Sequence, residues 1–334
     1  MRASSAARCG RQHGESETVD RAFRRRLHGP GHLRIMGAHD GLTAKLAENA
    51  GFDAIWAGGL GISSSYRLPD AGLLTMTEFL NAAVQMRSAC GLPIIADVDA
   101  GFGDLNVVRR MVQLYETAAV DAVCIEDKQY PKRNSFRDGH KLEEPARFAE
   151  KIAVARSARY GTEFMIIARL ESLIAGAGMA DALSRAELYH DAGADAVLIH
   201  SRASHAGEIR EFCERWHRTG RDVPVLCVPT TYASVTAHEL GQMGVSGIIY
   251  ANQAIRASTK AVSEALASIA KHDSSSEVEC SMTTLSELFE LVGMDDVLGD
   301  TPWRGVQPAP QDPNRTDEPR SADGIEANET ATVA

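Results

Sequence analysis

The sequence contains no long apolar run, no closely spaced cysteine pair and no excess of positive charge, and each absence excludes a class of protein. A transmembrane helix needs roughly 18 or more consecutive apolar residues, and no stretch of this chain supplies them. The six cysteines are scattered without a CxxC pair, which argues against a zinc site and against a disulfide framework. The first 30 residues also lack the apolar core of a secretory signal, so we expect a cytoplasmic protein.

The chain has 35 Lys and Arg residues and 45 Asp and Glu residues, so its net charge is −10. An acidic protein is repelled by nucleic acid and by anionic membranes, so we expect neither as a partner. Residues 1–30 are the exception, with seven Arg and three acidic residues. We interpret them as a disordered Arg-rich N-terminal extension, and an RNA-binding arm is the alternative.

Residues 299–334 differ in composition from the rest of the chain. Five of the twelve prolines fall there, acidic residues outnumber basic ones, and aliphatic side chains are sparse. Such a segment cannot bury enough apolar surface to offset the entropy of ordering it, so we predict a disordered Pro-rich acidic tail. One folded domain is therefore expected over residues 31–298.

Between the two tails, eight short apolar runs alternate with amphipathic helical patterns. Each run is unbroken, as expected for parallel strands that are covered on both faces. The runs are Leu33–Met36, Ala54–Ala57, Pro93–Ala96, Ala122–Ile125, Phe164–Ala168, Ala196–Ile199, Val223–Val228 and Gly247–Tyr250. Eight such units predict a (β/α)8 barrel of the TIM type. The alternative is a doubly wound sheet, which needs a GxGxxG turn that residues 58–61 do not supply.

A further amphipathic helix is predicted after the eighth unit, from Met282 to Val297. Its apolar stripe consists of Leu285, Leu288, Phe289 and Val292. A complete barrel leaves no obvious place for this helix in its own chain. We therefore expect it to make a subunit contact.

Polar residues follow the apolar runs, and barrel enzymes carry their chemistry at the carboxyl ends of the strands. Asp97 and Asp99 come after the third run, and Glu126 comes after the fourth. Three carboxylates that converge on one barrel mouth would repel one another, which favours a bound hard cation such as Mg²⁺. Helix capping or pairing with lysine is the alternative explanation for any one of them.

Arg169 and His200 follow the fifth and sixth runs. A charged group at the end of an apolar run is costly unless it is paired, and a guanidinium binds carboxylates and phosphoryl groups bidentately. We expect Arg169 to bind ligand, with pairing to Glu171 as the structural alternative. His200 is expected to donate to the substrate, with a satisfied core histidine as the alternative.

The connection after the fourth run, residues 126–140, is long and polar for a compact barrel. Connections of this length often act as lids over an active site. As a lid, the segment would bring Lys132, Asn134 and Ser135 over an anionic ligand and exclude water from the reaction. The alternative is a solvated surface loop.

At these positions the sequence resembles the phosphoenolpyruvate mutases of the isocitrate lyase/phosphoenolpyruvate mutase superfamily, from about Gly37 to Val292. The resemblance rests on the order and spacing of short segments through the eight strand ends. These segments are Gly37–Leu42, Trp56–Gly59, Leu68–Asp70, Asp97–Gly103, Glu126–Ser135, Ala168–Glu171, Leu198–Ser201, Val228–Thr231 and Tyr250–Asn252.

The resemblance implies a (β/α)8 barrel that uses Mg²⁺ and binds small α-keto or enol acids. It also implies a homotetramer built from dimers, and the subunits of each dimer exchange a C-terminal helix. Asp97 is then the main metal ligand, and Asp99 and Glu126 act largely through water molecules.

The remaining site residues follow from the same resemblance. Trp56 and the backbone amides of Gly58 and Gly59 are implied to bind the pyruvate part of the ligand. Asn134, Ser135, Arg169 and His200 are implied to contact the phosphoryl part, Asp70 to shape the site, and Lys132 to close the lid.

The lid segment distinguishes the reactions of the superfamily. Carbon–carbon lyases carry a catalytic Cys in a Lys-Arg-Cys-Gly-His motif there, whereas this chain has Lys132-Arg133-Asn134-Ser135-Phe136. Phosphonopyruvate hydrolases typically have Thr in place of Asn134, so the mutase pattern is favoured. Phosphonopyruvate hydrolysis and a barrel that binds without catalysis are the alternatives.

The favoured reaction interconverts phosphoenolpyruvate and phosphonopyruvate and opens a phosphonate biosynthetic pathway, such as that of an antibiotic. Phosphoenolpyruvate is favoured at equilibrium, so a phosphonopyruvate decarboxylase or an aminotransferase is the expected pathway partner.

Two departures from the mutase pattern are present. Position 58 is usually Ser in the mutases, and the segment after Asp99 carries Ala100, Phe102 and Asp104, where Thr, Tyr and Asn are common. These changes remove hydroxyl groups and add a charge near the expected metal. They either tune the rate or indicate a related phosphonate substrate.

Overall fold

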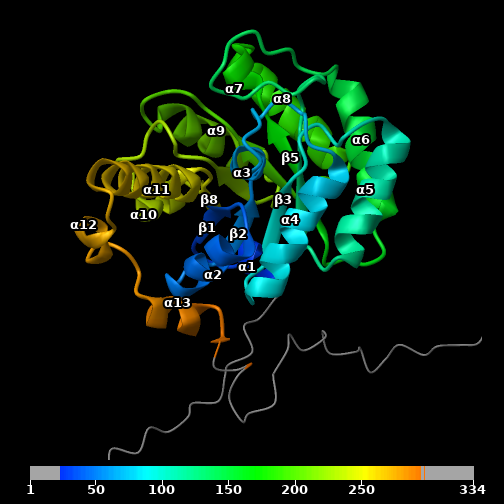
Figure 1. Ribbon diagram of the computed structural model, residues 1–334. Coiled ribbons are helices and arrows are strands. Elements are labelled where there is room, and N and C mark those ends of the chain that lie inside the picture. Colours follow the sequence, from blue (N-terminus) through cyan, green and yellow to red (C-terminus); the bar gives the residue numbers. More distant parts are fainter. Residues whose placement is uncertain (1–22, 295–296, 298–334) are drawn as a thin grey trace, which may run out of the picture. The chain divides into compact units, whose positions relative to one another are not determined.

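The computed structural model describes residues 23–294 and residue 297 (Figure 1). Eight parallel strands form a closed barrel in which each strand pairs with the next in the sequence and β8 pairs with β1. The (β/α)8 barrel predicted from the sequence is therefore confirmed. The strands are β1 (Leu33–Ala38), β2 (Ala54–Ala57), β3 (Ile94–Asp97), β4 (Ala122–Glu126), β5 (Met165–Leu170), β6 (Ala196–Ile199), β7 (Val225–Cys227) and β8 (Gly247–Tyr250).

Three charged residues belong to the strands themselves and do not merely follow them. β3 ends on Asp97, β4 ends on Glu126, and Arg169 is the next-to-last residue of β5. Glu126 and Arg169 are also partners in the register of β4 and β5. The hydrogen-bonded barrel wall therefore fixes the backbone of all three at the carboxyl rim.

Helices connect the strands and surround the barrel (Figure 1). In α5, Val108, Met111, Val112 and Tyr115 recur at helical spacing and are all buried, and Asp104 caps the first turn. No helix among the described residues is long and apolar enough to cross a membrane. The connecting helices are α2 (Gly41–Asn49), α3 (Gly59–Ser65), α4 (Met76–Ala89), α5 (Leu105–Thr117), α6 (Pro145–Ala158), α7 (Ser172–Ala175), α8 (Gly178–Asp191), α9 (Gly207–His217) and α10 (Ala237–Gln242).

Two apolar layers hold the barrel together. The larger layer lies between the strands and the surrounding helices. The smaller layer fills the barrel interior with side chains such as Ile35, Trp56 and Ile167. Phe23 and Leu27 of α1 (Phe23–His28) belong to this interior layer, together with the first residues of several strands. Thus α1 covers the amino end of the barrel, opposite the rim that carries the charged residues.

The prediction of a disordered extension over residues 1–30 is wrong for residues 23–28, which form α1. Phe23 and Leu27 lie four residues apart, share one helix face and are almost completely buried. Arg26 adds an ion pair of 2.8 Å to Asp53. The Arg-rich composition hides this helix because only two of its side chains are large and apolar. Residues 1–22 and the predicted acidic tail, residues 299–334, lie outside the described residues.

The helix after β8 differs from those around the barrel. α11 (Gln253–His272) has 20 residues, and none of them is buried. Val262 and Leu266 on this helix are more than half exposed, at 57% and 62%. An apolar stripe is therefore open on α11, and the short helix α12 (Ser276–Glu279) follows it.

The helix predicted over residues 282–297 is interrupted, since α13 spans Leu285–Leu291 and residues 294 and 297 are again helical. Gly293 has φ +69°, the left-handed conformation that commonly ends a helix. The chain divides into two compact units after Thr284, so α13 belongs to the second unit and not to the barrel domain as expected. The predicted exchange of this helix between subunits stays a prediction.

Candidate active site

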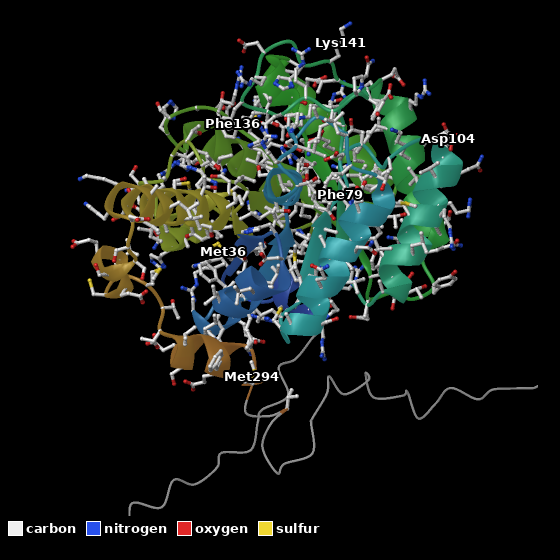
Figure 2. All side chains as sticks on the ribbon, viewed as in Figure 1. Met36, Phe79, Asp104, Phe136, Lys141 and Met294 are labelled. Carbon is white, nitrogen blue, oxygen red and sulfur yellow. The ribbon has the colours of Figure 1, made fainter. Side chains whose placement is uncertain are left out.

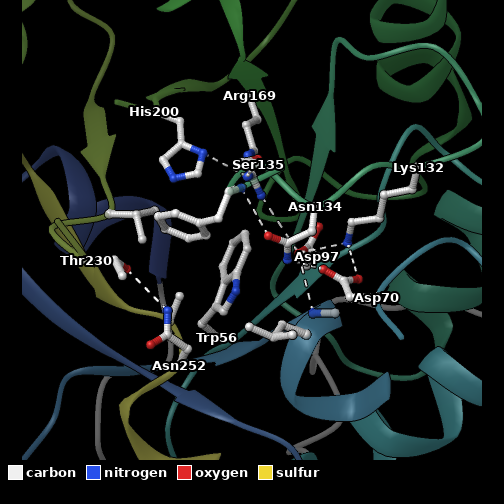
Figure 3. Close-up of a pocket in the computed structure, with 16 residues that line it drawn as sticks. Trp56, Asp70, Asp97, Lys132, Asn134, Ser135, Arg169, His200, Thr230 and Asn252 are labelled. Atoms are coloured by element: carbon white, nitrogen blue, oxygen red, sulfur yellow. Dashed lines mark hydrogen bonds and ion pairs between the residues drawn. The ribbon is translucent and has the colours of Figure 1, made fainter. Parts of the chain in front are cut away.

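A pocket that opens to solvent lies at the carboxyl ends of the strands (Figure 3), and the space between its atoms, open solvent included, is about 530 Å³. Of the twelve site residues singled out from the sequence, Asp99 and Glu126 lie beside the pocket and do not line it. The other ten line it together: Trp56, Gly58, Gly59, Asp70, Asp97, Lys132, Asn134, Ser135, Arg169 and His200.

One side of the pocket is an acidic cluster, which consists of Asp70, Asp97 and Asp99 around Lys132. The Nζ atom of Lys132 lies 2.8 Å from Asp70 Oδ1 and 3.9 Å from Asp97 Oδ2, and it contacts Asp99 Oδ1. Burial alone would lower the pKa of Lys132, but the three carboxylates outweigh burial and raise that pKa well above its ordinary value. Lys132 is therefore a fixed positive charge at neutral pH.

Gly59, the first residue of α3, makes room for Lys132. A Cβ atom on Gly59 would lie 2.7 Å from Lys132 Nζ, closer than real Cβ atoms approach other heavy atoms. The Gly59 N–H group also points at Asp97 Oδ2, 3.4 Å away. A larger residue at position 59 would therefore push Lys132 out of the acidic cluster.

Asp99 and Glu126 lie just behind the pocket wall. Asp99 has φ +48°, which is uncommon for a residue other than glycine, and its carbonyl accepts a hydrogen bond of 2.8 Å from Glu126 N. Burial raises the pKa of Asp99 to about 7 against the opposing charge of Lys132, and Asp97 and Glu126 add to the rise. Burial also raises the pKa of Glu126. Neither carboxylate oxygen of Glu126 has a hydrogen-bond partner among the described residues.

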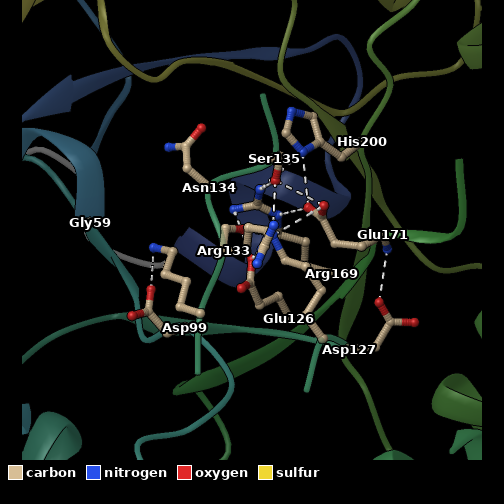
Figure 4. A network of polar contacts seen from close by, with 12 residues as sticks. Gly59, Asp99, Glu126, Asp127, Arg133, Asn134, Ser135, Arg169, Glu171 and His200 are labelled. Carbon is tan, nitrogen blue, oxygen red and sulfur yellow. Dashed lines mark hydrogen bonds and ion pairs between the residues drawn. The ribbon is translucent and has the colours of Figure 1, made fainter. Parts of the chain in front are cut away.

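The other side of the pocket is a cluster of Arg169, Glu171, His200 and Ser135, called the Arg169 cluster here (Figure 4). Arg169 Nε donates to Glu171 Oε1 at 2.6 Å, and Arg169 Nη2 donates to Ser135 Oγ at 3.1 Å. Ser135 Oγ in turn donates to Glu171 Oε2 at 2.9 Å. Burial would raise the pKa of Glu171, but Arg169 and His200 outweigh burial and hold that pKa well below its ordinary value. Glu171 is therefore the fixed anion that orients Arg169.

His200 is held by one nitrogen and leaves the other free for a ligand. Its Nδ1 atom lies 2.9 Å from both Arg169 Nη2 and Glu171 Oε1. Its Nε2 atom is buried without a hydrogen-bond partner in the described chain, and the ring lines the pocket. Burial lowers the pKa of His200, so the imidazole is neutral at physiological pH.

Two kinds of contact hold the lid in place: a backbone bridge between its two ends, and the buried side chain of Lys128. Lys128 and Leu142 form an antiparallel bridge across the base. The buried Lys128 Nζ atom donates to Ser135 Oγ at 3.0 Å and lies 3.2 Å from Glu126 Oε2. Lys141, the residue just after the lid, projects outward (Figure 2), whereas Ser135 lines the pocket.

Asn134 ties the lid to the acidic cluster. Its Nδ2 atom donates to Asp70 Oδ2 at 2.9 Å, while Lys132 holds the other oxygen of that carboxylate at 2.8 Å. Burial would raise the pKa of Asp70, but Lys132 and Asn134 lower it below its ordinary value. Asp70 is thus an ionised anchor for two lid residues.

Six further residues line the pocket. Thr230 and Asn252 follow β7 and β8 and are joined by a hydrogen bond of 3.3 Å, so the strand-end rule identifies their position. The Phe136 ring lies edge-on to the His200 ring at 6.2 Å, a contact between distant segments that no local pattern indicates. The full set is Leu60, Phe136, Val228, Thr230, Ala251 and Asn252.

The acidic cluster suits a hard cation that is held partly through water. Its donors are carboxylate oxygens, the ligand type that Mg²⁺ prefers. In the part of the chain that the structure describes, no group of three or more His, Cys, Asp or Glu side chains is arranged to hold a metal ion by itself. Neither carboxylate oxygen of Glu126 accepts a hydrogen bond in the described chain, although Oε2 forms an ion pair of 3.2 Å with Lys128 Nζ, so both oxygens could accept hydrogen bonds from water molecules bound to a metal. The assignment of Asp97 as a direct ligand, and of Asp99 and Glu126 as water-mediated ones, stays a prediction.

A (β/α)8 barrel whose strands deliver paired acidic and basic side chains to the carboxyl rim has the architecture of a barrel enzyme. A fixed guanidinium, a neutral imidazole and residues of the loop over residues 126–140 meet in the pocket, and such groups are able to bind a small anion. Residues 23–270 match the family model described as phosphoenolpyruvate phosphomutase. The chain therefore belongs to the phosphoenolpyruvate phosphomutase family, which is part of the phosphoenolpyruvate mutase/isocitrate lyase superfamily.

Relatives with two different activities are similar to this chain. A phosphonopyruvate hydrolase of Variovorax sp. (strain Pal2) is 41% identical over 83% of this chain and 95% of its own length. The crystal structure of a phosphoenolpyruvate phosphomutase from Streptomyces platensis subsp. rosaceus matches with a TM-score of 0.81 and 45% identity, over 83% of this chain and 96% of that one. A phosphonopyruvate hydrolase structure in complex with oxalate and Mg²⁺ matches with a TM-score of 0.78 and 39% identity, over 84% and 97% of the two chains.

Proposed function

We propose that this protein is a Mg²⁺-dependent phosphoenolpyruvate mutase that interconverts phosphoenolpyruvate and phosphonopyruvate. The observation that carries the proposal is the position of Asn134. Its amide lines the pocket and is held by Asp70, on the same lid that presents Lys132 and Ser135. A neutral amide can hold a phosphoryl group by hydrogen bonding without activating a water molecule.

The pyruvate part of the ligand would bind near Trp56 and the backbone amides of Gly58 and Gly59. Asp97, with Asp99 and Glu126 through water, would hold Mg²⁺ beside that part. Bound Mg²⁺ would supply the positive charge that stabilises an enolate. The magnesium and oxalate reported in the hydrolase structure support this assignment, because oxalate resembles the pyruvate enolate.

The phosphoryl part would bind to the Arg169 cluster. Arg169 supplies two or more N–H donors, and Glu171 fixes the direction in which they point. The unpartnered Nε2 atom of His200 and the Ser135 hydroxyl lie on the same side. Because the phosphoryl group carries its charge on three oxygens, fixed donors around it stabilise the transition state without acid or base chemistry.

The lid excludes the water that would capture a phosphoryl group in transfer. Lys132 and Asn134 hold the lid to Asp70, and Phe136 covers the pocket beside His200. A closed and dry site favours return of the phosphoryl group to the pyruvate carbon or oxygen over its transfer to water.

Hydrolysis of phosphonopyruvate is the second candidate, and the 41% identity to a hydrolase favours it. Incubation of the protein with phosphonopyruvate and Mg²⁺, followed by ³¹P NMR, separates the two activities. A phosphoenolpyruvate signal supports the mutase, whereas phosphate with pyruvate supports the hydrolase. If neither forms and oxalate with Mg²⁺ gives no thermal stabilisation, the barrel is not an enzyme of this type.

Asn134→Ala tests the lid residue that carries the proposal. We expect a loss of about 100-fold in kcat with little change in stability, because the side chain is half-buried on a loop. The exposed Arg137→Ala in the same lid is the matched control. An Asn134→Ala variant with full mutase activity contradicts the proposed role.

The proposal extends to the assembly and the pathway. We propose a cytoplasmic homotetramer in which the open apolar stripe of α11 and the C-terminal helix contact neighbouring subunits. Sedimentation velocity of the full chain gives the subunit number, and Leu266→Glu on α11 should reduce it. A phosphonopyruvate decarboxylase or an aminotransferase is the proposed pathway partner, since the mutase equilibrium favours phosphoenolpyruvate.

A further inference from the structure

Asp127, the second residue of the lid, follows β4 directly and is completely buried. Its N–H group donates to Arg169 O at 3.1 Å, which continues the pairing of β4 with β5 by one residue. In a parallel pair, the carbonyl of the same residue then accepts from the N–H group two residues further along the partner strand, which is that of Glu171. In this protein the side chain takes that place, because Glu171 N donates to Asp127 Oδ1 at 2.8 Å (Figure 4).

The backbone carbonyl of Asp127 is thereby free to hold the far end of the lid. Asp127 O accepts a hydrogen bond of 2.9 Å from Glu143 N, three residues after the lid. Asp127 therefore ties together the beginning of the lid, its end, and Glu171, the anion that orients Arg169.

Glu171 depends on this support because it lies between two elements. It follows β5 and precedes α7, and its φ of −104° and ψ of 13° lie in a sparsely populated region of backbone conformation that recurs in active sites. Its side chain does not cap α7 and instead accepts from Arg169 Nε. The bond to Asp127 Oδ1 fixes the N–H group of Glu171, and with it the direction of the side chain.

Two residues of α8 hold the other oxygen of the Asp127 carboxylate. Arg185 Nη1 donates to Asp127 Oδ2 at 3.2 Å and to Glu143 O at 2.9 Å. The Tyr189 hydroxyl donates to Asp127 Oδ2 at 3.0 Å. The side chains of Asp127, Arg185 and Tyr189 are all buried, so water does not compete for these bonds.

We infer that Asp127 is a positioning residue that couples the lid to the Arg169 cluster, and that Arg185 and Tyr189 fix its carboxylate for this role. Without the carboxylate, Glu171 N would turn to the Asp127 carbonyl and compete with Glu143 N for it. The lid and the Arg169 cluster would therefore lose order together. The consequence for phosphoryl binding rests on the proposed function.

Asp127→Ala tests the coupling by hydrogen exchange, measured by mass spectrometry on the full chain. Loss of a buried hydrogen bond should speed exchange about fivefold in two peptides, one over residues 127–143 and one over residues 168–177. The affinity for sulfopyruvate with Mg²⁺ should fall about tenfold, because its sulfonate would bind to the Arg169 cluster as the phosphoryl group does. Oxalate has no such group, so its affinity should fall at most about threefold.

Asp195→Ala is the matched control. The Asp195 carboxylate also accepts from an N–H group of β5, that of Ile166 at 2.8 Å, and it pairs with Arg159 at 2.9 Å. Asp195 lies directly before β6, however, at the amino end of the barrel. This variant should lose stability without any change of exchange in the two peptides or of sulfopyruvate affinity.

A second pair of variants makes a smaller change. Tyr189→Phe removes one hydrogen bond to Asp127 and should shift exchange and sulfopyruvate affinity in the same direction, by about twofold. Tyr115→Phe is its control, because the buried Tyr115 hydroxyl has no hydrogen-bond partner in the described chain. It should shift neither quantity.

The outcomes separate this inference from the proposed function. If exchange does not rise in both peptides, or if Asp195→Ala changes both as much as Asp127→Ala does, the inference is overturned. Equal losses of affinity for oxalate and sulfopyruvate also overturn it. If the wild-type protein binds neither ligand, the proposed function fails, and exchange in the two peptides still decides the coupling. Should Asp127→Ala not fold, the comparison of Tyr189→Phe with Tyr115→Phe decides it in the same way.

Discussion

The two sides of the pocket differ in how their buried charges are balanced. In the acidic cluster, three carboxylates share one lysine, so the cluster keeps an excess of negative charge. In the Arg169 cluster, Glu171 lies beside two cations, Arg169 at 2.6 Å and the buried Lys128 at 3.4 Å, and beside a neutral imidazole. The first side can accept a further cation, and the second can accept an anion with little reorganisation. These opposite charges would therefore orient a ligand that has an enolate end and a phosphoryl end before its individual hydrogen bonds form.

The two sides also differ in what holds them. Asp97 and Arg169 lie in strands, whereas Lys132 and Ser135 reach the pocket from the lid. Lid opening would thus remove a cation from the acidic cluster and a hydroxyl from the Arg169 cluster. Four substitutions, taken from the largest expected effect to the smallest, test whether the two sides are independent.

Arg169→Met should have the largest effect, because it leaves Glu171 buried without its main partner. We expect a loss of about 3 to 5 kcal/mol in the free energy of unfolding and of about 1000-fold in kcat/KM. Urea denaturation and steady-state kinetics measure the two quantities. Affinity for Mn²⁺ in place of Mg²⁺ should change far less, and an equal loss of metal affinity would show that the sides are not independent.

Lys132→Met should destabilise the metal-free protein by about 3 kcal/mol, because the three buried carboxylates lose their shared cation. Mg²⁺ should then raise the melting temperature of the variant more than that of the wild type. The exposed Lys141→Met serves as the control with the same chemical change. A variant that gains no more from Mg²⁺ than the wild type does would contradict the picture of a shared cation site.

Asp97→Asn should weaken Mn²⁺ binding by about 100-fold or more, because it neutralises the expected direct ligand. Electron paramagnetic resonance of free Mn²⁺ gives the affinity without any substrate. The Arg169 cluster should be undisturbed, so the fall in stability with pH described next should persist in this variant. Unchanged Mn²⁺ affinity would remove Asp97 from the metal site.

The pH dependence of stability should show the smallest effect. Burial holds the pKa of His200 below its ordinary value of 6.5, so the unfolded chain binds this proton at a higher pH than the folded chain does. Stability should therefore fall as the pH falls below 6.5, by at most about 1.4 kcal/mol per pH unit from this group. His200→Gln removes that component, so urea curves at neutral and mildly acidic pH should differ less for the variant than for the wild type. An identical pH dependence in both proteins would show that His200 is not buried in its neutral form.

Much of the barrel could be predicted because its strands are covered on both faces and so appear as unbroken apolar runs. Three of the runs match β2, β6 and β8 residue for residue. The helix α1 could not be predicted, since two apolar residues among arginines form no recognisable pattern and their burial depends on the barrel end that they cover. The prediction of one helix over residues 282–297 is too long, because the apolar stripe gives no sign of the break at Gly293, where the backbone turns left-handed.

The site residues were identifiable because strand ends converge in a barrel, whatever the sequence between them. The partners of those residues were not. That Lys132 lies among three carboxylates, and that Gly59 makes room for it, depends on contacts between segments distant in the chain. The same holds for Trp56 over Gly58, where the sequence shows only the loss of a hydroxyl and the structure shows the ring that takes its space.

The most direct test of the central claim is the fate of the phosphoryl group. Phosphonopyruvate is incubated with the protein and Mg²⁺ in ¹⁸O-enriched water, and the products are followed by ³¹P NMR. A pocket that holds the phosphoryl group between Arg169, Asn134 and His200 and excludes water should yield phosphoenolpyruvate whose three non-bridging phosphoryl oxygens carry no solvent oxygen. Inorganic phosphate that carries ¹⁸O as the main product would contradict the account and assign the chain to hydrolysis.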